Sequence, residues 1–272
     1  MDIMFMLEAP LYFVQISDTH IGPTADYSRD SHYSLPCAKR IVEVINTLPT
    51  RPDFVIHTGD VVTNPHPVSY QLAAETFAGL EVPIYYVTGN HDRSADIRHY
   101  LPMGPKVDAG RDPSRLSYTF EVKGFRFLVL DARGPDEIDP QGLLSDSDLE
   151  LLAEEATPTG PPLIVFVHFP ALPLNSPWMD GNMLIQNGEA MHEALLPARS
   201  RLRGVFHGHI HQPMQIVRDG ILYVSSASAF SQFGAWPGNT DPFYDPAHDP
   251  GYNFVHLLNH QTVIHQHTFP RP

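Results

Sequence analysis

Five clusters of Asp, Asn and His stand along the chain, and each directly follows a short apolar segment. In chain order they are Asp18-Thr-His20, Asp60, Asn90-His91-Asp92, His168 and His209-Ile-His211. Carboxylate oxygens, amide oxygens and imidazole nitrogens are donors that suit borderline divalent cations. A single Asp-X-His would carry little information, but five clusters in this order predict one site for two metal ions. The chemistry expected of such a site is hydrolysis by activated water.

The apolar segments before the clusters predict buried strands, because they are short and rich in β-branched and aromatic residues. They cover residues 11–17, 54–59, 84–89, 163–167 and 205–208. In open α/β sheets the ligand site lies beyond the carboxyl ends of the strands. Strands that deliver polar side chains at that end can therefore bring them to one point in space.

Other patterns place helices and hairpins between these strands. Helical spacing of apolar residues marks 35–48, 69–80 and 145–156. Hairpins are predicted for 116–122 with 125–130 around Lys123-Gly124, for 213–217 with 221–224 around Asp219-Gly220, and for 253–258 with 262–267. Strands that continue after the last cluster suggest a second sheet packed on the first. The chain has no internal repeat and no linker, which predicts a single domain over residues 1–272.

Composition favours a globular enzyme and disfavours a nucleic-acid-binding protein. Hydrophobic residues make up 42% of the 272 residues, which is enough to form a buried core. The chain is acidic, because it has 31 Asp and Glu but only 17 Lys and Arg, and no run of basic residues would attract nucleic acid. The single cysteine, Cys37, excludes an intramolecular disulfide, fits a reducing compartment and is expected to be a small buried helix residue. Residues 1–16 lack a basic start and are interrupted by Glu8 and Pro10, which disfavours a signal peptide. We expect a cytoplasmic protein with no membrane partner.

One segment stands apart in composition. Residues 232–251 are rich in Pro, Gly and Asp and carry the aromatic side chains of Phe233, Trp236, Phe243 and Tyr244. A loop of this length within a domain is usually functional or disordered. Two interpretations carry equal weight: a surface excursion whose aromatics pack locally, or a flap near the metals or contact between copies in a homo-oligomer.

With their flanking glycines the clusters become Asp18-Thr-His20, Gly59-Asp60, Gly89-Asn90-His91-Asp92, His168 and Gly208-His209-Ile-His211. This series resembles the calcineurin-like metallophosphoesterases, and its spacing is most similar to class III cyclic nucleotide phosphodiesterases and their glycerophosphodiesterase relatives. The motifs span residues 18–211, and weaker similarity continues beyond them. Thr63 stands where the family often has an acidic residue, and Phe169 follows His168 where many members have a second histidine.

The resemblance implies a four-layer α/β/β/α sandwich, in which two mixed β-sheets are flanked by helices. It places Asp18, His20, Asp60 and His211 on a first metal ion, and Asp60, Asn90, His168 and His209 on a second. Asp60 would bridge the two ions. This ligand set tolerates Mn, Fe, Zn or Co.

The resemblance also implies hydrolysis of small phosphodiesters by metal-activated hydroxide attack. It places His91 near the leaving group as an acid or electrostatic stabiliser. Asp92 would orient the His91 ring, although a role in the turn is nearly as well supported. The regions around Trp178-Met-Asp180 and 225–233 resemble the pocket of cyclic nucleotide phosphodiesterases, so Trp178 or Phe230 would either stack on a base or simply pack.

The leading hypothesis is therefore a phosphodiesterase for 3′,5′-cyclic nucleotides of the cyclic AMP type. A glycerophosphodiesterase or a broad-specificity phosphatase is the second hypothesis, and a scaffold without catalysis is the third. The remaining histidines are expected outside the site. His57 is expected to be packed or hydrogen-bonded, and His207, which precedes Gly208, to point to the other face from its neighbour. His265 and His267 are expected to lie on an exposed sheet face rather than bind a metal ion.

Overall fold

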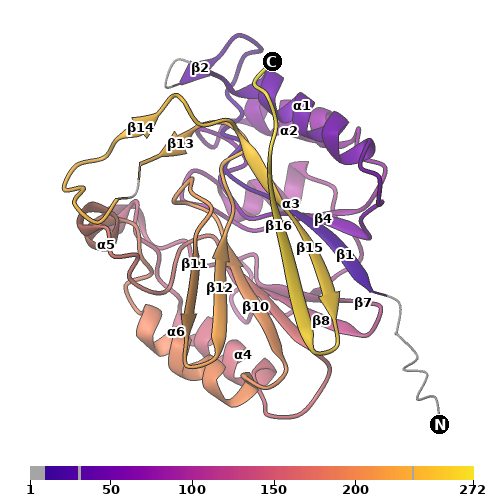
Figure 1. Cartoon of the computed structure of the whole chain (residues 1–272), viewed down its shortest axis with the longest axis vertical. Coiled ribbons are helices and arrows are strands. Elements are labelled where there is room, and N and C mark those ends of the chain that lie inside the picture. The colour runs from indigo at the N-terminus through magenta and orange to yellow at the C-terminus, as the bar shows by residue number, and fades with distance from the viewer. Residues whose placement is uncertain (1–9, 30–31, 235) are drawn as a thin grey trace.

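The apolar segments of the chain become the strands of two β-sheets that stack face to face, with helices on both outer faces (Figure 1). This computed structural model describes residues 10–29, 32–234 and 236–272. Residues 1–9, which hold most of the segment tested for a signal peptide, lie outside the described residues. Within the described ranges, no helix has both the length and the apolar character needed to cross a bilayer.

The first sheet holds three of the strands that precede the polar clusters. β1 (Leu11–Ile16), β4 (Phe54–His57) and β5 (Ile84–Tyr86) are parallel, so their carboxyl ends share one edge. β15 (Gly251–Leu258) and β16 (Gln261–Thr268) form the predicted hairpin and pair antiparallel beside β1. The strand order is β16-β15-β1-β4-β5.

The second sheet holds the other two cluster strands, β9 (Leu163–Phe166) and β10 (Leu202–His207), in the order β11-β12-β10-β9-β8-β7-β6. Its other strands are β6 (Val107–Asp108), β7 (Tyr118–Val122), β8 (Phe125–Val129), β11 (Gln215–Arg218) and β12 (Ile221–Ser225). The expectation that strands after the last cluster build this sheet is wrong in part. Only β11 and β12 join it, whereas β15 and β16 return to the first sheet.

Side-chain alternation along the second sheet explains how the two sheets and the helices form layers. Phe127, Phe166 and Phe206 point to the first sheet, where the ring of Phe13 lies 5.7 Å from that of Phe166 and 5.3 Å from that of Phe206. Leu128, Val165 and Val205 follow the opposite parity and belong to the core beneath the helices. Successive strand residues face opposite sides, so one sheet serves two apolar layers.

Helices cover both outer faces, as Figure 1 shows. The core between the sheets continues under α1 (Ser34–Asn46), α2 (Pro67–Phe77) and α3 (Ser94–Tyr100). The second core lies under α4 (Asp146–Glu155) and α6 (Gly188–Leu195). The four-layer α/β/β/α sandwich implied by the resemblance is therefore confirmed.

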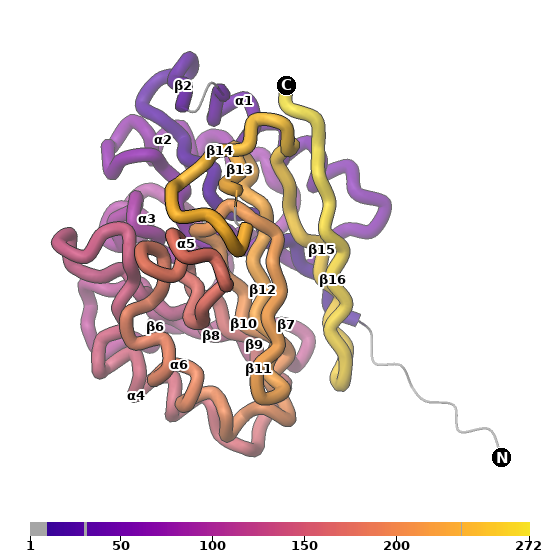
Figure 2. The backbone as a smooth tube through the Cα atoms, turned by 60° about the vertical axis from the view of Figure 1, so that its left-hand side comes forward, coloured from indigo at the N-terminus to yellow at the C-terminus, as the bar shows by residue number. Residues whose placement is uncertain are grey.

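Short elements lie at the end of the molecule where the parallel strands finish. They are β2 (Ser28–Arg29), β3 (His32–Tyr33), α5 (Pro177–Asn182), β13 (Gln232–Phe233) and β14 (Tyr244–Asp245). Single 3₁₀ turns cover Asp136–Ile138 and Leu196–Ala198. β13 pairs with β14, so residues 232–251 are not one loop as expected but begin with a small hairpin beside α5 (Figure 2).

Candidate metal centre

The seven residues expected to bind metal meet where the carboxyl ends of both sheets come together. The loops after β1, β4 and β5 supply Asp18, His20, Asp60 and Asn90, and those after β9 and β10 supply His168, His209 and His211. Asn90 is half-buried and the other six side chains are buried. One consequence of the two-sheet arrangement is that neither sheet alone presents the complete set.

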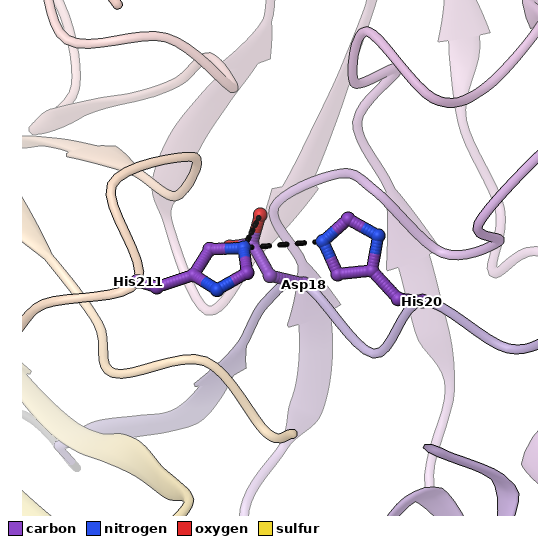
Figure 3. Close-up of side chains that lie close together, drawn as sticks. All are labelled: Asp18, His20 and His211. Atoms are coloured by element: carbon purple, nitrogen blue, oxygen red, sulfur yellow. Dashed lines mark hydrogen bonds and ion pairs between the residues drawn. The ribbon is translucent and has the colours of Figure 1, made fainter. Parts of the chain in front are cut away.

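The first group consists of Asp18, His20 and His211 (Figure 3). The Nε2 atoms of His20 and His211 are 3.1 Å apart, and Nε2 of His211 is 3.4 Å from Oδ1 of Asp18. Nδ1 of His211 donates a hydrogen bond to the carbonyl of Ser231 at 2.7 Å. Because a carbonyl only accepts, Nδ1 carries the proton, and the Nε2 lone pair is left to face the group.

The second group consists of Asp60, His168 and His209. Nδ1 of His168 donates to the carbonyl of Thr58 at 2.7 Å, which again leaves Nε2 as the nitrogen available to a ligand. This Nε2 is 3.1 Å from Nδ1 of His209 and 3.4 Å from Oδ2 of Asp60. Oδ2 of Asp60 is also 3.7 Å from Nε2 of His20, so it lies between the two groups.

Two buried acceptors in the centre make no hydrogen bond that would explain their burial. They are Oδ1 of Asp18 and Oδ1 of Asn90, and Nε2 of His209 is a third buried atom of the centre without a hydrogen-bond partner. Buried polar atoms are almost always paired, because an unpaired one costs desolvation free energy. Acceptor atoms that face one another with no hydrogen-bond donor between them repel one another, and a bound cation removes this repulsion. The donor set therefore fits a divalent metal centre.

The electrostatics of the centre favour positive charge. Burial is the largest influence on Asp60 and opposes its ionisation, yet the imidazoles of His168, His91 and His20 together outweigh it and hold the pKa of this carboxyl well below its usual value. Burial likewise lowers the pKa of His168, but the Asp60 and Asp18 carboxylates outweigh it and raise this pKa to about 9. Metal binding must displace that proton, so metal ions and protons compete for the same nitrogen.

Five of the seven residues have left-handed backbone, which is uncommon for residues other than glycine. Their φ angles are 56° at Asp18, 45° at His20, 54° at Asp60, 70° at His209 and 50° at His211. Such conformations cost free energy and cluster at functional sites. The loops are therefore shaped for the positions of these side chains rather than for local stability.

The position of Gly59, directly before Asp60, leaves no room for a side chain. Its φ is 102°, and a Cβ at this position would lie 2.3 Å from Nδ1 of His168. Any side chain would therefore push His168 away from the Thr58 carbonyl that fixes its protonated nitrogen. The glycine allows the two sheets to approach at the centre.

His91 lies beside the two groups, but Asp92 does not orient it. Nδ1 of His91 donates to the carbonyl of Thr63 at 2.7 Å. Asp92 instead accepts hydrogen bonds from the amides of Gly89, Val61 and Val62 at 3.0, 3.2 and 3.2 Å. The prediction that Asp92 holds the His91 ring is therefore wrong, and the role in the turn is the one the contacts support. Asp92 is completely buried, and burial followed by the charge of Asp60 raises its pKa to about 6.

Thr63 takes over the orienting role through its backbone, at the position where the family often has an acidic side chain. Residue types could not reveal this contact, because every residue has a carbonyl group. The side chain of Thr63 is held in turn by the hydroxyl of Tyr27 at 3.1 Å.

A cavity of about 140 Å³ opens onto the centre. Its lining residues are His20, Arg29, Asp60, Asn90, His91, Pro140, Trp178, Met183, His209, His211 and Phe233. Trp178 is half-buried and lines this cavity from α5, as a stacking residue would. Phe230 is fully buried and its ring packs 6.3 Å from that of His20, so the contacts support packing rather than stacking.

The β13–β14 hairpin lies against the centre. The ring of Phe233 is 4.8 Å from that of His211 and 4.5 Å from that of Tyr244. Arg29 donates from Nη2 to the hydroxyl of Tyr244 at 3.1 Å. These contacts favour the flap near the metals over a surface excursion, although Trp236 of the same segment is 70% exposed. Arg29 and Phe233 were not among the expected site residues.

The remaining histidines lie where the sequence placed them. His57 is fully buried and 2.9 Å from the hydroxyl of Thr19, and His207 is also buried. His265 and His267 are exposed on β16 with stacked rings 6.1 Å apart. Cys37 is buried on α1, and burial raises the pKa of its thiol to about 11.

Comparison with known proteins agrees with this geometry. The family profile described as calcineurin-like phosphoesterase matches residues 11–213. The chain is 26% identical to a probable cyclic nucleotide phosphodiesterase of Psychrobacter arcticus, over 92% of this chain and 90% of the relative. It is 29% identical to a glycerophosphodiester phosphodiesterase of Enterobacter lignolyticus, over 84% and 80%. The solved structure of a dimetal phosphatase of Danio rerio shares the fold, with a TM-score of 0.64, 15% identity and coverage of 96% of this chain and 100% of that one.

Proposed function

The chain belongs to the calcineurin-like phosphoesterase family, and on this premise we propose that it hydrolyses small phosphodiesters, with 3′,5′-cyclic nucleotides as the first substrate class. Two curated relatives support a diester substrate, since one is named a cyclic nucleotide phosphodiesterase and the other a glycerophosphodiester phosphodiesterase. The half-buried indole of Trp178 at the cavity favours a substrate with a base that can stack.

One observation carries the proposal: two groups of Asp and His side chains suited to bind metal lie on either side of Oδ2 of Asp60, beside a cavity. We assign Asp18, His20, Asp60 and His211 to a first metal ion and Asp60, Asn90, His168 and His209 to a second, with Mn, Fe, Zn or Co as candidates. When bound, two such ions polarise a phosphate and lower the pKa of water.

The chain's own residues then orient the reaction. The amide of His91 donates to Oδ1 of Asp60 at 2.9 Å, which leaves Oδ2 for the shared position. The carbonyl of Thr63 holds Nδ1–H of His91, so only Nε2 of this ring can exchange a proton. We assign His91 Nε2 to protonate the leaving oxygen of the diester.

A substrate panel tests the proposal. Protein stripped with a chelator and reloaded with each candidate metal is assayed on cyclic AMP, 2′,3′-cyclic AMP, a glycerophosphodiester, bis-p-nitrophenyl phosphate and p-nitrophenyl phosphate. We expect metal-dependent cleavage of the diesters, with cyclic AMP preferred over the monoester. Metal-loaded protein that cleaves no diester would refute the proposal.

The second candidate, a glycerophosphodiesterase, is favoured by the relative of Enterobacter lignolyticus and by the small cavity volume of about 140 Å³. A higher kcat/KM for the glycerophosphodiester than for cyclic AMP would select it. A scaffold without catalysis is disfavoured, because donors are present at every position of both groups.

A further inference from the structure

A cavity of about 720 Å³ lies at the opposite end of the molecule from the metal centre. We call it the distal pocket, and its lining residues are Lys123, Gly124, Phe125, Gly160, Pro162, Ser200, Arg201, Arg203, Asn259 and His260. They belong to the turn between β7 and β8, the loops that lead into β9 and β10, and the turn between β15 and β16. Figure 1 shows this last turn at the end remote from β13 and β14. β10 leads from the distal pocket to the metal centre, and its six residues span about 20 Å.

The lining of the distal pocket carries an excess of positive charge. It contains Lys123, Arg201 and Arg203, together with His260, but no Asp or Glu among the described residues. The chain as a whole has the opposite balance, with 31 Asp and Glu against 17 Lys and Arg. The three cations are therefore not part of a generally basic surface. Cations gathered around one cavity raise the local concentration of anions.

Backbone carbonyl groups hold the two guanidinium groups in place. Arg201 donates from Nε to the carbonyl of Thr157 at 2.8 Å and from Nη1 to that of Pro161 at 2.7 Å. Arg203 donates from Nε to the carbonyl of Asn259 at 2.7 Å. Such bonds fix the orientation of a guanidinium but do not cancel its charge. Burial lowers the pKa of both groups, because desolvation disfavours the charged form, and a bound anion would offset that cost.

The carboxylates closest to these cations in the contact network point to other partners or to solvent. Oδ1 of Asp53 is 2.7 Å from Nζ of Lys123, but this lysine is 41% exposed, and exposed pairs are weak. Glu155, whose charge also acts on Arg201, is 2.6 Å from Nη2 of Arg126. Neither carboxylate lines the distal pocket, so the lining itself stays positive.

Two glycines leave the cations uncovered. Gly160 has a φ of 129°, and a Cβ there would lie 3.5 Å from Cζ of Arg201, so a longer side chain would cover the guanidinium. A Cβ on Gly124, next to Lys123, would meet no atom within 4 Å. A ligand can therefore approach the cations from the cavity.

The donors suit phosphate oxygens. A guanidinium matches them with a planar set of N–H groups, and a lysine ammonium binds phosphate as a point charge. Several cations around one cavity attract a multiply charged anion more strongly than a singly charged one. The volume of about 720 Å³, against about 140 Å³ at the metal centre, also leaves room for a group attached to the phosphate.

We propose that the distal pocket binds a multiply charged phosphate anion, carried by pyrophosphate or by a phosphomonoester, through Lys123, Arg201 and Arg203. The site does not depend on the proposed function, because it shares no residue with the metal centre. The competing explanation is that Arg201 and Arg203 only satisfy the carbonyl groups of the loops around them.

Calorimetric titration of metal-free protein at low ionic strength separates these explanations. Pyrophosphate and adenosine monophosphate are the two probes, and removal of metal keeps the metal centre from binding them. We expect Lys123→Met to weaken pyrophosphate binding by about 3- to 10-fold and Arg203→Met by about 10- to 100-fold, as loss of bonds between charged groups predicts. If Arg203→Met does not fold, Lys123→Met decides, because this exposed side chain is not needed to hold the loop carbonyls.

The matched control is Arg40→Met, which removes one positive charge from an exposed arginine paired with Glu43 on α1. It should bind pyrophosphate as wild type does. Tighter binding of adenosine monophosphate than of pyrophosphate would assign the pocket to phosphomonoesters, and the reverse order would assign it to inorganic anions. Either order supports the site.

Three results would overturn the inference. Folded wild type might bind neither probe at millimolar concentration, or both Lys123→Met and Arg203→Met might bind pyrophosphate with wild-type affinity. An equal loss of affinity in Arg40→Met would show that only the overall charge of the chain matters. Binding of a single-stranded oligonucleotide without either small anion would also count against a small-molecule site.

Discussion

Gly89→Ala puts a methyl group where Asp60 lies. A Cβ on Gly89 would be 2.1 Å from Oδ1 of Asp60 and 2.4 Å from its backbone nitrogen. Ordinary contact begins at 3.4 Å, so the oxygen must retreat by 3.4 minus 2.1, about 1.3 Å. Gly89 is not among the residues with positive φ, so alanine causes no backbone strain of its own. Any effect therefore reports the displacement of Asp60.

The displacement should damage both groups at once. Oδ2 of Asp60 is 3.7 Å from Nε2 of His20 and 3.4 Å from Nε2 of His168. A misplacement of about 1 Å can cost on the order of 100-fold in rate. We therefore expect kcat/KM for bis-p-nitrophenyl phosphate to fall by at least about 100-fold. Metal content should fall below that of wild type.

The assay combines steady-state kinetics with elemental analysis of dialysed protein. The matched control is Gly181→Ala in α5, where a Cβ meets no atom within 4 Å and activity should stay within about two-fold. Gly89→Ala protein that keeps both its metal and its activity would refute the account of how Asp60 is held.

Three further predictions address neighbouring residues. His91→Ala should keep its metal but slow cleavage of cyclic AMP by about 100- to 10,000-fold, with a smaller loss on bis-p-nitrophenyl phosphate; equal losses would exclude leaving-group protonation. Asp92→Ala should lower the free energy of unfolding by about 3 kcal/mol or more, because three amides lose their acceptor, and urea unfolding at wild-type stability would contradict this. Burial lowers the pKa of His57 to about 3, whereas in the unfolded chain this imidazole is protonated below about pH 6.5. The stability that the folded protein gains from a neutral His57 is therefore fully present above pH 6.5 and is lost as the pH falls toward 3. When the pH falls from 7.5 to 5.5, the free energy of unfolding of metal-free wild type, measured in urea, should decrease by about 1.4 kcal/mol more than that of His57→Gln. An equal decrease in both proteins would contradict the claim that His57 is neutral in the folded state.

The sequence predicts most strands, three helices and the meeting of seven polar residues, because these depend on local patterns and on strand ends. The partition of strands between the sheets is not local. β15 pairs with β1 across almost the whole chain, for example Val255 with Phe13, and no short pattern specifies that partner. The expectation for the second sheet is therefore right for β11 and β12 and wrong for β15 and β16.

Within the site, side-chain identity predicts what can bind a metal ion but not what holds each side chain. The His91 ring donates a hydrogen bond to the backbone carbonyl of Thr63, and the Asp92 carboxylate accepts hydrogen bonds from backbone amides, such as that of Val61. The contact of Arg29 with Tyr244 joins residues 215 positions apart. Such partners become visible only when the loops are placed in three dimensions.

The most direct test of the central claim is an anomalous difference map from crystals of the manganese- or zinc-loaded protein. The account predicts two peaks, about 3.5 to 4 Å apart, with Oδ2 of Asp60 between them. The first should be bounded by His20 and His211 and the second by His168 and His209. A single peak, or peaks remote from Asp60, would contradict the two-metal centre.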